Sequence, residues 1–100
     1  MEKRYYGRWL REVNERWEIK LPHTFKMSKV ILKEGRQGLE IHPLNSEEIV
    51  EEEAPFVFLT KIRHRKIQIP CILRQSKSFW LGRKVMIAGK GNYLEIWPWR

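Results

Sequence analysis

Short runs in which apolar and polar residues alternate recur along the chain, and glycine, proline or polar residues separate them. A period of two residues is typical of a β-strand that buries one face. Trp9 and Trp17 fall on apolar positions of the first two runs. The pattern predicts eight strands, at residues 8–13, 16–21, 30–32, 39–41, 56–62, 66–69, 84–88 and 93–97. Hairpin turns are expected between successive pairs of strands, at Asn14-Glu15, 35–38, 63–65 and 89–92.

Helical signals are few and short. A proline at the first helical position predicts one or two turns of helix after Pro22 and after Pro70, and the clearer helix covers residues 70–77. Cys71 is expected to be buried at its start. Residues 46–54 begin at a capping serine, carry carboxylates in the first turn and precede a proline, which predicts a short acidic helix. We expect a solvated linker helix there; the alternatives are a docking site for a basic partner and a clamp on the protein's own basic face.

The chain repeats itself on either side of this acidic segment. Ile-Lys-Leu-Pro at residues 19–22 matches Ile-Gln-Ile-Pro at residues 67–70. Leu-Glu-Ile-His-Pro at residues 39–43 matches Leu-Glu-Ile-Trp-Pro at residues 94–98. Both pairs occur in the same order, which indicates an internal duplication.

The duplication predicts one mainly β domain with short helices. Residues 1–100 would form a single domain of two repeats, at about 5–44 and 56–99, joined by the helix at 46–54. One repeat has too few strands to bury both faces of its hairpins. The two copies are therefore expected to close on each other as a pseudo-twofold barrel.

Positive charge is concentrated in the second half. The composition, 42% apolar and 32% charged, is that of a folded domain, and 20 Lys and Arg against 12 acidic residues give a formal net charge of +8. Residues 1–54 hold ten bases and eleven acids, whereas residues 55–100 hold ten bases and Glu95 alone. Such an excess favours an anionic partner, first of all nucleic acid or a membrane surface.

Residues for catalysis and metal binding are scarce. All 12 acidic residues are Glu, Cys71 is the single cysteine, and the three His are scattered. No acid, base and nucleophile converge at a recognisable spacing, so we expect no enzyme, no cofactor, no metal and no small-molecule substrate. No apolar run approaches the roughly 20 residues that cross a bilayer, and the N-terminus lacks the pattern of a secretory signal. We expect a cytoplasmic protein without membrane contact.

Five segments carry a family resemblance, and they span nearly the whole chain: Tyr5–Trp9, Ile19–Lys26, Lys66–Arg74, Lys84–Gly89 and Asn92–Trp97. In this order they resemble the MraZ family of bacterial transcriptional regulators. The resemblance implies a tandem swapped-hairpin barrel of the AbrB and SpoVT type and a homo-oligomer such as a ring. It also implies binding of double-stranded DNA, and hence an association with the nucleoid, through an Asp-x-x-x-Arg motif in each half.

Neither half keeps that motif intact. The matching positions lie eight and four residues before the repeated proline: Asn14 and Glu18 in the first half, Ile62 and Lys66 in the second. Asn14 can replace the hydrogen-bonding side of an Asp, but the carboxylate of Glu18 repels phosphate. We therefore expect the first half to have lost its contact with DNA.

The second half has instead gained a basic turn. Lys and Arg supply the phosphate contacts that dominate affinity for DNA, and Arg also binds guanine edges in the major groove. Arg74 is expected to support the turn or the following helix rather than to read bases. The candidate DNA-binding residues are Lys61, Arg63, His64, Arg65, Lys66 and Arg74.

The leading hypothesis is a repressor-type DNA-binding regulator that acts as a multimer, and other interpretations stay open. A basic turn can simply keep a protein soluble. An AbrB-like antitoxin or interaction module would hold an acidic partner, and an RNA or single-strand binder would stack bases on aromatic rings. We expect these rings instead to pack the barrel and its oligomer contacts, with residues 97–99 as an interface strip. The rings are Phe79, Trp80, Tyr93, Trp97 and Trp99.

Overall fold

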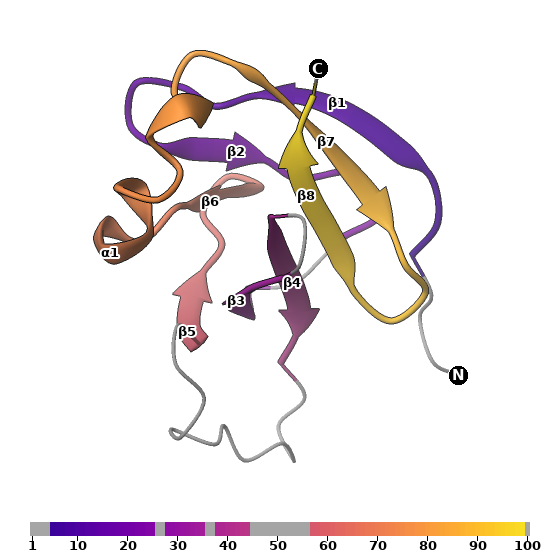
Figure 1. The fold of residues 1–100 in the computed structure, drawn as a ribbon. Coiled ribbons are helices and arrows are strands. Elements are labelled where there is room, and N and C mark those ends of the chain that lie inside the picture. Colours follow the sequence, from indigo (N-terminus) through magenta and orange to yellow (C-terminus); the bar gives the residue numbers. More distant parts are fainter. Residues whose placement is uncertain (1–4, 26–27, 36–37, 45–56, 100) are drawn as a thin grey trace.

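The computed structural model describes residues 5–25, 28–35, 38–44 and 57–99, which form a mainly β fold with little helix (Figure 1). Each of the eight predicted strands overlaps an observed one. The elements in chain order are β1 (Arg8–Glu12), β2 (Glu18–Lys20), β3 (Lys29–Glu34), β4 (Leu39–Pro43), β5 (Val57–Lys61), β6 (Lys66–Gln68), α1 (Cys71–Arg74), the 3₁₀ turn η1 (Ser78–Trp80), β7 (Lys84–Gly89) and β8 (Leu94–Pro98). The acidic helix predicted at 46–54 lies outside the described residues.

The strands form two antiparallel sheets. Six strands are ordered β1-β7-β8-β4-β3-β5, and β2 pairs separately with β6. Two of the predicted hairpins are confirmed as ladders, β3–β4 and β7–β8. The other two predicted hairpins are wrong as ladders, because β1 pairs with β7 rather than β2, and β5 pairs with β3 rather than β6. The first strand of each half therefore adds to the sheet of the other half.

These pairings repeat between the halves. The β1–β7 ladder corresponds to β5–β3, and hairpin β3–β4 corresponds to hairpin β7–β8. The two remaining ladders join equivalent strands: Ile19 lies opposite Ile67 in β2–β6, and Glu40 lies opposite Glu95 in β4–β8. The sequence repeat thus reappears as a repeat of strand pairing.

The expected closed barrel is not found among the described residues. β1 and β5 are the outer strands of the six-stranded sheet, and no ladder joins them. The chain turns after each of these strands into β2 or β6, and those two short strands pair with each other. The six-stranded sheet stays open because β1 and β5 do not pair with each other. The strands that follow them, β2 and β6, form the separate ladder instead.

The helical part is smaller than predicted. Of the helix expected over 70–77, only α1 is helical, followed by turns and η1. Cys71 is exposed, so the prediction that it is buried is wrong. After Pro22 the described residues form a turn, in which the Phe25 N–H donates to the Pro22 carbonyl at 3.1 Å. No helix in the described part is long and apolar enough to span a membrane.

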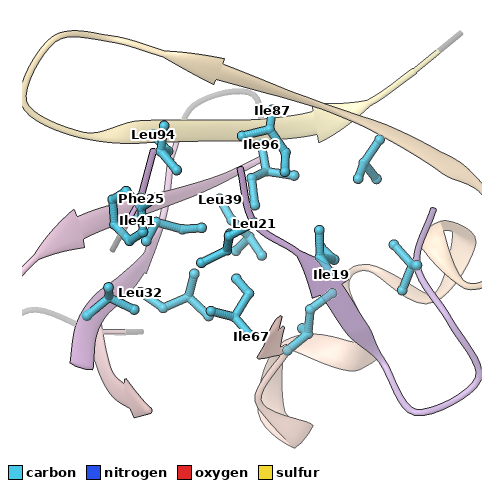
Figure 2. Packing of buried hydrophobic residues seen from close by; sticks show 14 of the residues in the cluster. Ile19, Leu21, Phe25, Leu32, Leu39, Ile41, Ile67, Ile87, Leu94 and Ile96 are labelled. Carbon is cyan, nitrogen blue, oxygen red and sulfur yellow. The ribbon is translucent and has the colours of Figure 1, made fainter. Parts of the chain in front are cut away.

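A single apolar cluster receives side chains from both halves and both sheets (Figure 2). Ile19 and Ile67 are fully buried where β2 pairs with β6. Leu39 and Ile41 of β4, with Leu94 and Ile96 of β8, line the same core from the six-stranded sheet; none has exposed surface. Because side chains alternate along a strand, the residues between them point to the outer face of each sheet. This alternation decides which side chains of the strands are available at the surface for a functional contact.

Candidate nucleic-acid interface

The most basic turn of the described chain joins β5 to β6. The Arg63 N–H donates to the Lys66 carbonyl at 3.1 Å, and the Lys66 N–H donates to the Arg63 carbonyl at 2.9 Å. The two central residues, His64 and Arg65, have φ values of 52° and 60°. Two left-handed residues closed by this pair of bonds define a type I′ turn, which is the tightest connection between antiparallel segments. Arg63, His64 and Arg65 are all exposed.

This turn is held by contacts with the first half. The Leu21 N–H donates to the Arg65 carbonyl at 2.6 Å. Nη1 of Arg65 donates to the imidazole of His23 and lies 2.9 Å from its Nε2. The equivalent backbone bond in the other direction runs from the Ile69 N–H to the Trp17 carbonyl at 2.8 Å. Each half therefore fixes the turn of the other.

The first-half turn has a different chemistry. Asn14 Oδ1 accepts hydrogen bonds from the N–H groups of Arg16 and Glu18, both at 2.9 Å, and Asn14 Nδ2 donates to Glu18 Oε1 at 3.0 Å. An Asp at position 14 would have no donor for that carboxylate, so Asn suits its partner. Trp17 is left-handed, with a φ of 61°, and belongs to this turn rather than to a strand pleat as predicted. The amide and the carboxylate satisfy each other and leave this turn without a basic pair.

The strand ladders align the two turns differently from a count of residues back from the repeated proline. Val13 donates its N–H to Arg83 and Ile62 donates its N–H to Ser28, at equivalent places in the two halves. Asn14 therefore corresponds to Arg63, because the second turn is one residue shorter. Ile62, the position obtained by counting back from Pro70, is a partly buried residue packed against the core.

The outer face of the β2–β6 ladder adds bases beside the turn. Lys20 lies directly opposite Lys66, and Glu18 lies opposite Gln68. Like charges opposite each other across strands are unfavourable, by up to about 1 kcal/mol. Within the described residues, no carboxylate lies within ion-pair distance of Lys20, Arg63 or Lys66. An anion bound across this face would relieve the repulsion.

Two predicted site residues lie at the margin of this surface. Lys61 is exposed at the end of β5, opposite the exposed Lys29 of β3. Arg74 is half-buried; its Nε donates to the Ile69 carbonyl at 3.0 Å, and its guanidinium lies 5.9 Å from the centre of the Trp17 ring. These contacts tie α1 to the first-half turn, which is a supporting role.

Sequence reasoning missed His23, Lys20 and Lys29 as members of this surface. All three belong to the first half, and pairing between the halves brings them beside the second-half turn. The repeat was visible, but the exchange of strands between repeats was not. The candidate site thus combines exposed bases from both halves around Arg63 and Arg65.

The aromatic side chains differ in their exposure. Trp80 is 1% exposed, as expected for a packing residue, whereas Phe79 is 53% exposed and Trp99 is 52% exposed. Trp97 is half-buried beneath Lys90, whose Nζ lies 5.9 Å from the ring centre. Phe79 and Trp99 are thus the most exposed rings of this group.

Two comparisons with known protein sequences found no match. No protein-family model matches the chain, and no curated protein sequence matches it.

Proposed function

We propose that this protein binds double-stranded DNA through the β5–β6 turn and acts as a transcriptional regulator of the repressor type. The observation that carries the proposal is the turn from Arg63 to Lys66, whose four side chains are basic or imidazole. The first three are exposed and Lys66 is partly exposed, and none has an acidic partner in an ion pair among the described residues. Phosphate contacts from such groups supply most of the affinity for DNA.

The shape of the turn suits the major groove. A type I′ connection has only two residues at its tip, and a tip of this width can enter the major groove, which is about 12 Å wide. Arg63 and Arg65 would reach base edges or phosphates, since a guanidinium donates two parallel hydrogen bonds to either acceptor. Lys61 and Lys66 would contact the phosphates on either side, and Lys20 would add to the positive potential beside them.

The strand pairing supports the resemblance to the MraZ and AbrB families. A tandem swapped hairpin requires that the first strand of each repeat pair within the other repeat, as β1 and β5 do. In this proposal the chain is a homo-oligomer that presents one basic turn per copy to spaced sites on the duplex. The Asn14–Glu18 turn stays away from the phosphates because its carboxylate is negatively charged.

Fluorescence anisotropy with a labelled duplex from the DNA upstream of the protein's own gene tests the proposal. The double variant Arg63→Ala/Lys66→Ala should bind at least tenfold more weakly, because it loses two phosphate or base contacts. Lys90→Ala, which removes an exposed base from the turn between β7 and β8, should bind like the wild type.

Equal affinity of the double variant and the wild type would contradict the proposal. Single-stranded DNA and RNA of the same sequence serve as competitors. If they displace the duplex and quench tryptophan fluorescence, the exposed aromatic rings rather than the turn make the contact.

A further inference from the structure

A second surface lies on the outer face of the six-stranded sheet. Leu39, Ile41, Leu94 and Ile96 point into the core, so the residues between them point outward. The register of β4 and β8 places Glu40 directly opposite Glu95. A protein of net charge +8 thus sets two carboxylates side by side at the centre of this sheet.

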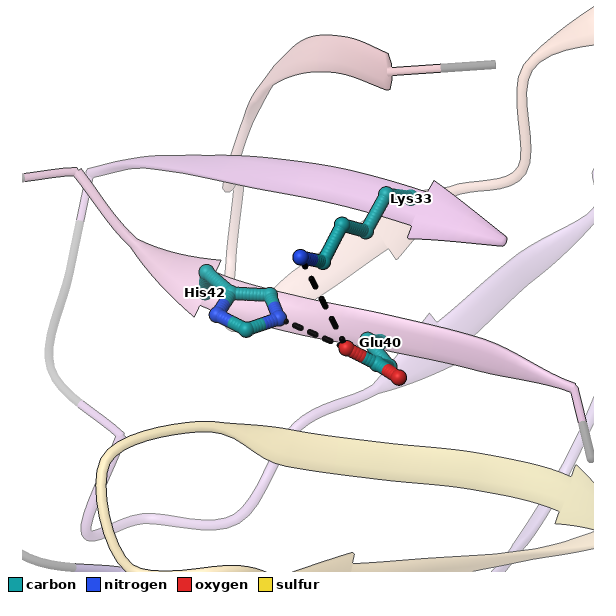
Figure 3. Close-up of polar contacts among 3 residues, drawn as sticks. All are labelled: Lys33, Glu40 and His42. Carbon is teal, nitrogen blue, oxygen red and sulfur yellow. Dashed lines mark hydrogen bonds and ion pairs between the residues drawn. The ribbon is translucent and has the colours of Figure 1, made fainter. Parts of the chain in front are cut away.

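Only one of these two carboxylates has a described basic partner. Glu40 Oε1 lies 2.9 Å from His42 Nε2 and 3.9 Å from Lys33 Nζ, and both side chains point toward it (Figure 3). Within the described residues, no Lys, Arg or His lies within 4.0 Å of the Glu95 carboxylate. Ala88 lies opposite Glu95 on the β7 side, at the position that corresponds to Lys33 in the other half. The counterpart of the Lys33–Glu40 pair is therefore incomplete.

Aromatic rings border the carboxylates. The Tyr93 and His42 rings stack at a centroid distance of 4.6 Å and an interplanar angle of 11°. Burial, and then the charges of Glu40 and Glu95, raise the pKa of Tyr93. Trp97 follows Glu95 on the same face of β8 and already attracts Lys90 to its ring. A carboxylate beside aromatic faces is a favourable environment for a guanidinium, which can pair with one and stack on the other.

Apolar side chains extend the surface toward both edges. On one side, Leu10 of β1 lies opposite Met86 of β7, which lies opposite Trp97. On the other side, Leu59 of β5 lies opposite Ile31 of β3. Leu10 is 40% exposed and Leu59 is 57% exposed, so the surface joins exposed apolar rows to an acidic centre.

We propose that this outer sheet face binds the basic β5–β6 turn of a second copy of the protein, with Arg63 or Arg65 of one copy paired to Glu95 of the other. The occupant follows from charge complementarity, because the same chain presents exposed arginines on a narrow turn and an incompletely paired carboxylate on a different sheet. Such a contact is heterologous, so it joins copies head to tail into a ring or a chain. The inference does not depend on DNA binding, but the two uses of the turn exclude each other: a copy whose turn is held by Glu95 of a second copy does not present that turn to the duplex.

Sedimentation velocity of the full chain without nucleic acid tests this contact. The wild type should associate at low salt and dissociate at about 1 M salt, where the screening length is about 3 Å. Glu95→Gln and Arg63→Glu should each weaken association at least tenfold. Glu15→Gln, which removes an exposed carboxylate from the first-half turn, is the matched control and should associate like the wild type.

A charge exchange separates a direct contact from a loss of folding. Glu95→Arg and Arg63→Glu should each fail to self-associate, whereas their mixture should form hetero-oligomers, since each variant complements the other. A monomeric wild type, unchanged association of Glu95→Gln, or a mixture that stays monomeric would overturn the proposal. Glu95→Gln should bind duplex DNA at least as tightly as the wild type. If the predicted self-association is not observed, the DNA-binding proposal still stands, and if duplex binding is not observed, the proposed contact between copies still stands.

Discussion

At the scale of single residues, two equivalent positions account for the difference between the halves. Asn14 and Glu18 close one turn, and Arg63 and Lys66 close the other with the same backbone hydrogen bond. The first pair satisfies itself through its side chains, since the amide donates to the carboxylate. The second pair carries two positive charges that repel each other. One turn is therefore chemically self-contained, whereas the other favours an external anion.

Grafting the second pair onto the first turn tests this difference. Asn14→Arg/Glu18→Lys should tighten duplex binding and steepen the slope of log K against log salt by up to about 1.8, because two phosphate contacts are added. Anisotropy titrations at several salt concentrations measure both quantities. Glu15→Gln, with its smaller change in charge, controls for a general electrostatic effect. If Asn14→Arg/Glu18→Lys binds the duplex no more tightly than this control, the first turn does not face the duplex.

Tyrosine ionisation gives a prediction for alkaline pH. Burial raises the pKa of Tyr5 above its ordinary value, so the folded protein holds this proton more tightly than the unfolded chain. The resulting stabilisation is complete below pH about 10 and is lost as the pH rises through the raised pKa. Denaturant unfolding between about pH 9 and 12 should therefore show a steeper loss of stability in the wild type than in Tyr5→Phe. Identical pH profiles would contradict the assignment.

At the scale of elements, the β5–β6 turn carries basic side chains at positions where they lower the stability of the fold. A type I′ turn favours Asn-Gly at its centre, since both residues are left-handed. The protein instead places His64 and Arg65 there, at a cost of about 1 kcal/mol or more each. The turn is thus built for its side chains rather than for its backbone.

Replacing the centre of the turn separates these two properties. His64→Asn/Arg65→Gly should raise the free energy of unfolding by about 1 kcal/mol or more, because the left-handed backbone is then relaxed. The same variant should bind duplex DNA more weakly. Lys66→Ala removes a base without relaxing the backbone, and denaturant titration should show no gain in its stability. If His64→Asn/Arg65→Gly is less stable than the wild type, the claim that His64 and Arg65 lower the stability of the turn is wrong.

At the scale of the whole molecule, the sequence predicted the parts better than their connections. Alternation located all eight strands, and the repeated Leu-Glu-Ile motif marked the two strands that meet at the centre of the sheet. Adjacent strands were expected to pair, as hairpins usually do, but β1 and β5 each pair within the other half. Alternation fixes the buried face of a strand and contains no information about its neighbour.

The candidate site was predicted in part for the same reason. Local composition identified Arg63 and Arg65. Residues 61–66 contain four Lys or Arg, one His and a single apolar residue, Ile62. His23 and Lys20 join them through contacts between the halves, which no local pattern encodes. The true counterpart of Asn14 required the ladder register, since counting along the sequence does not detect a turn shortened by one residue.

The salt dependence of duplex binding tests the central claim most directly. If Lys61, Arg63, Arg65 and Lys66 each neutralise one phosphate, log K should fall with log salt at a slope of about −3.6 for each chain engaged. For Arg63→Ala/Lys66→Ala the slope should be about −1.8. Duplex binding that does not respond to salt, or a double variant with the wild-type slope, would contradict the assignment of this turn as the DNA-binding element.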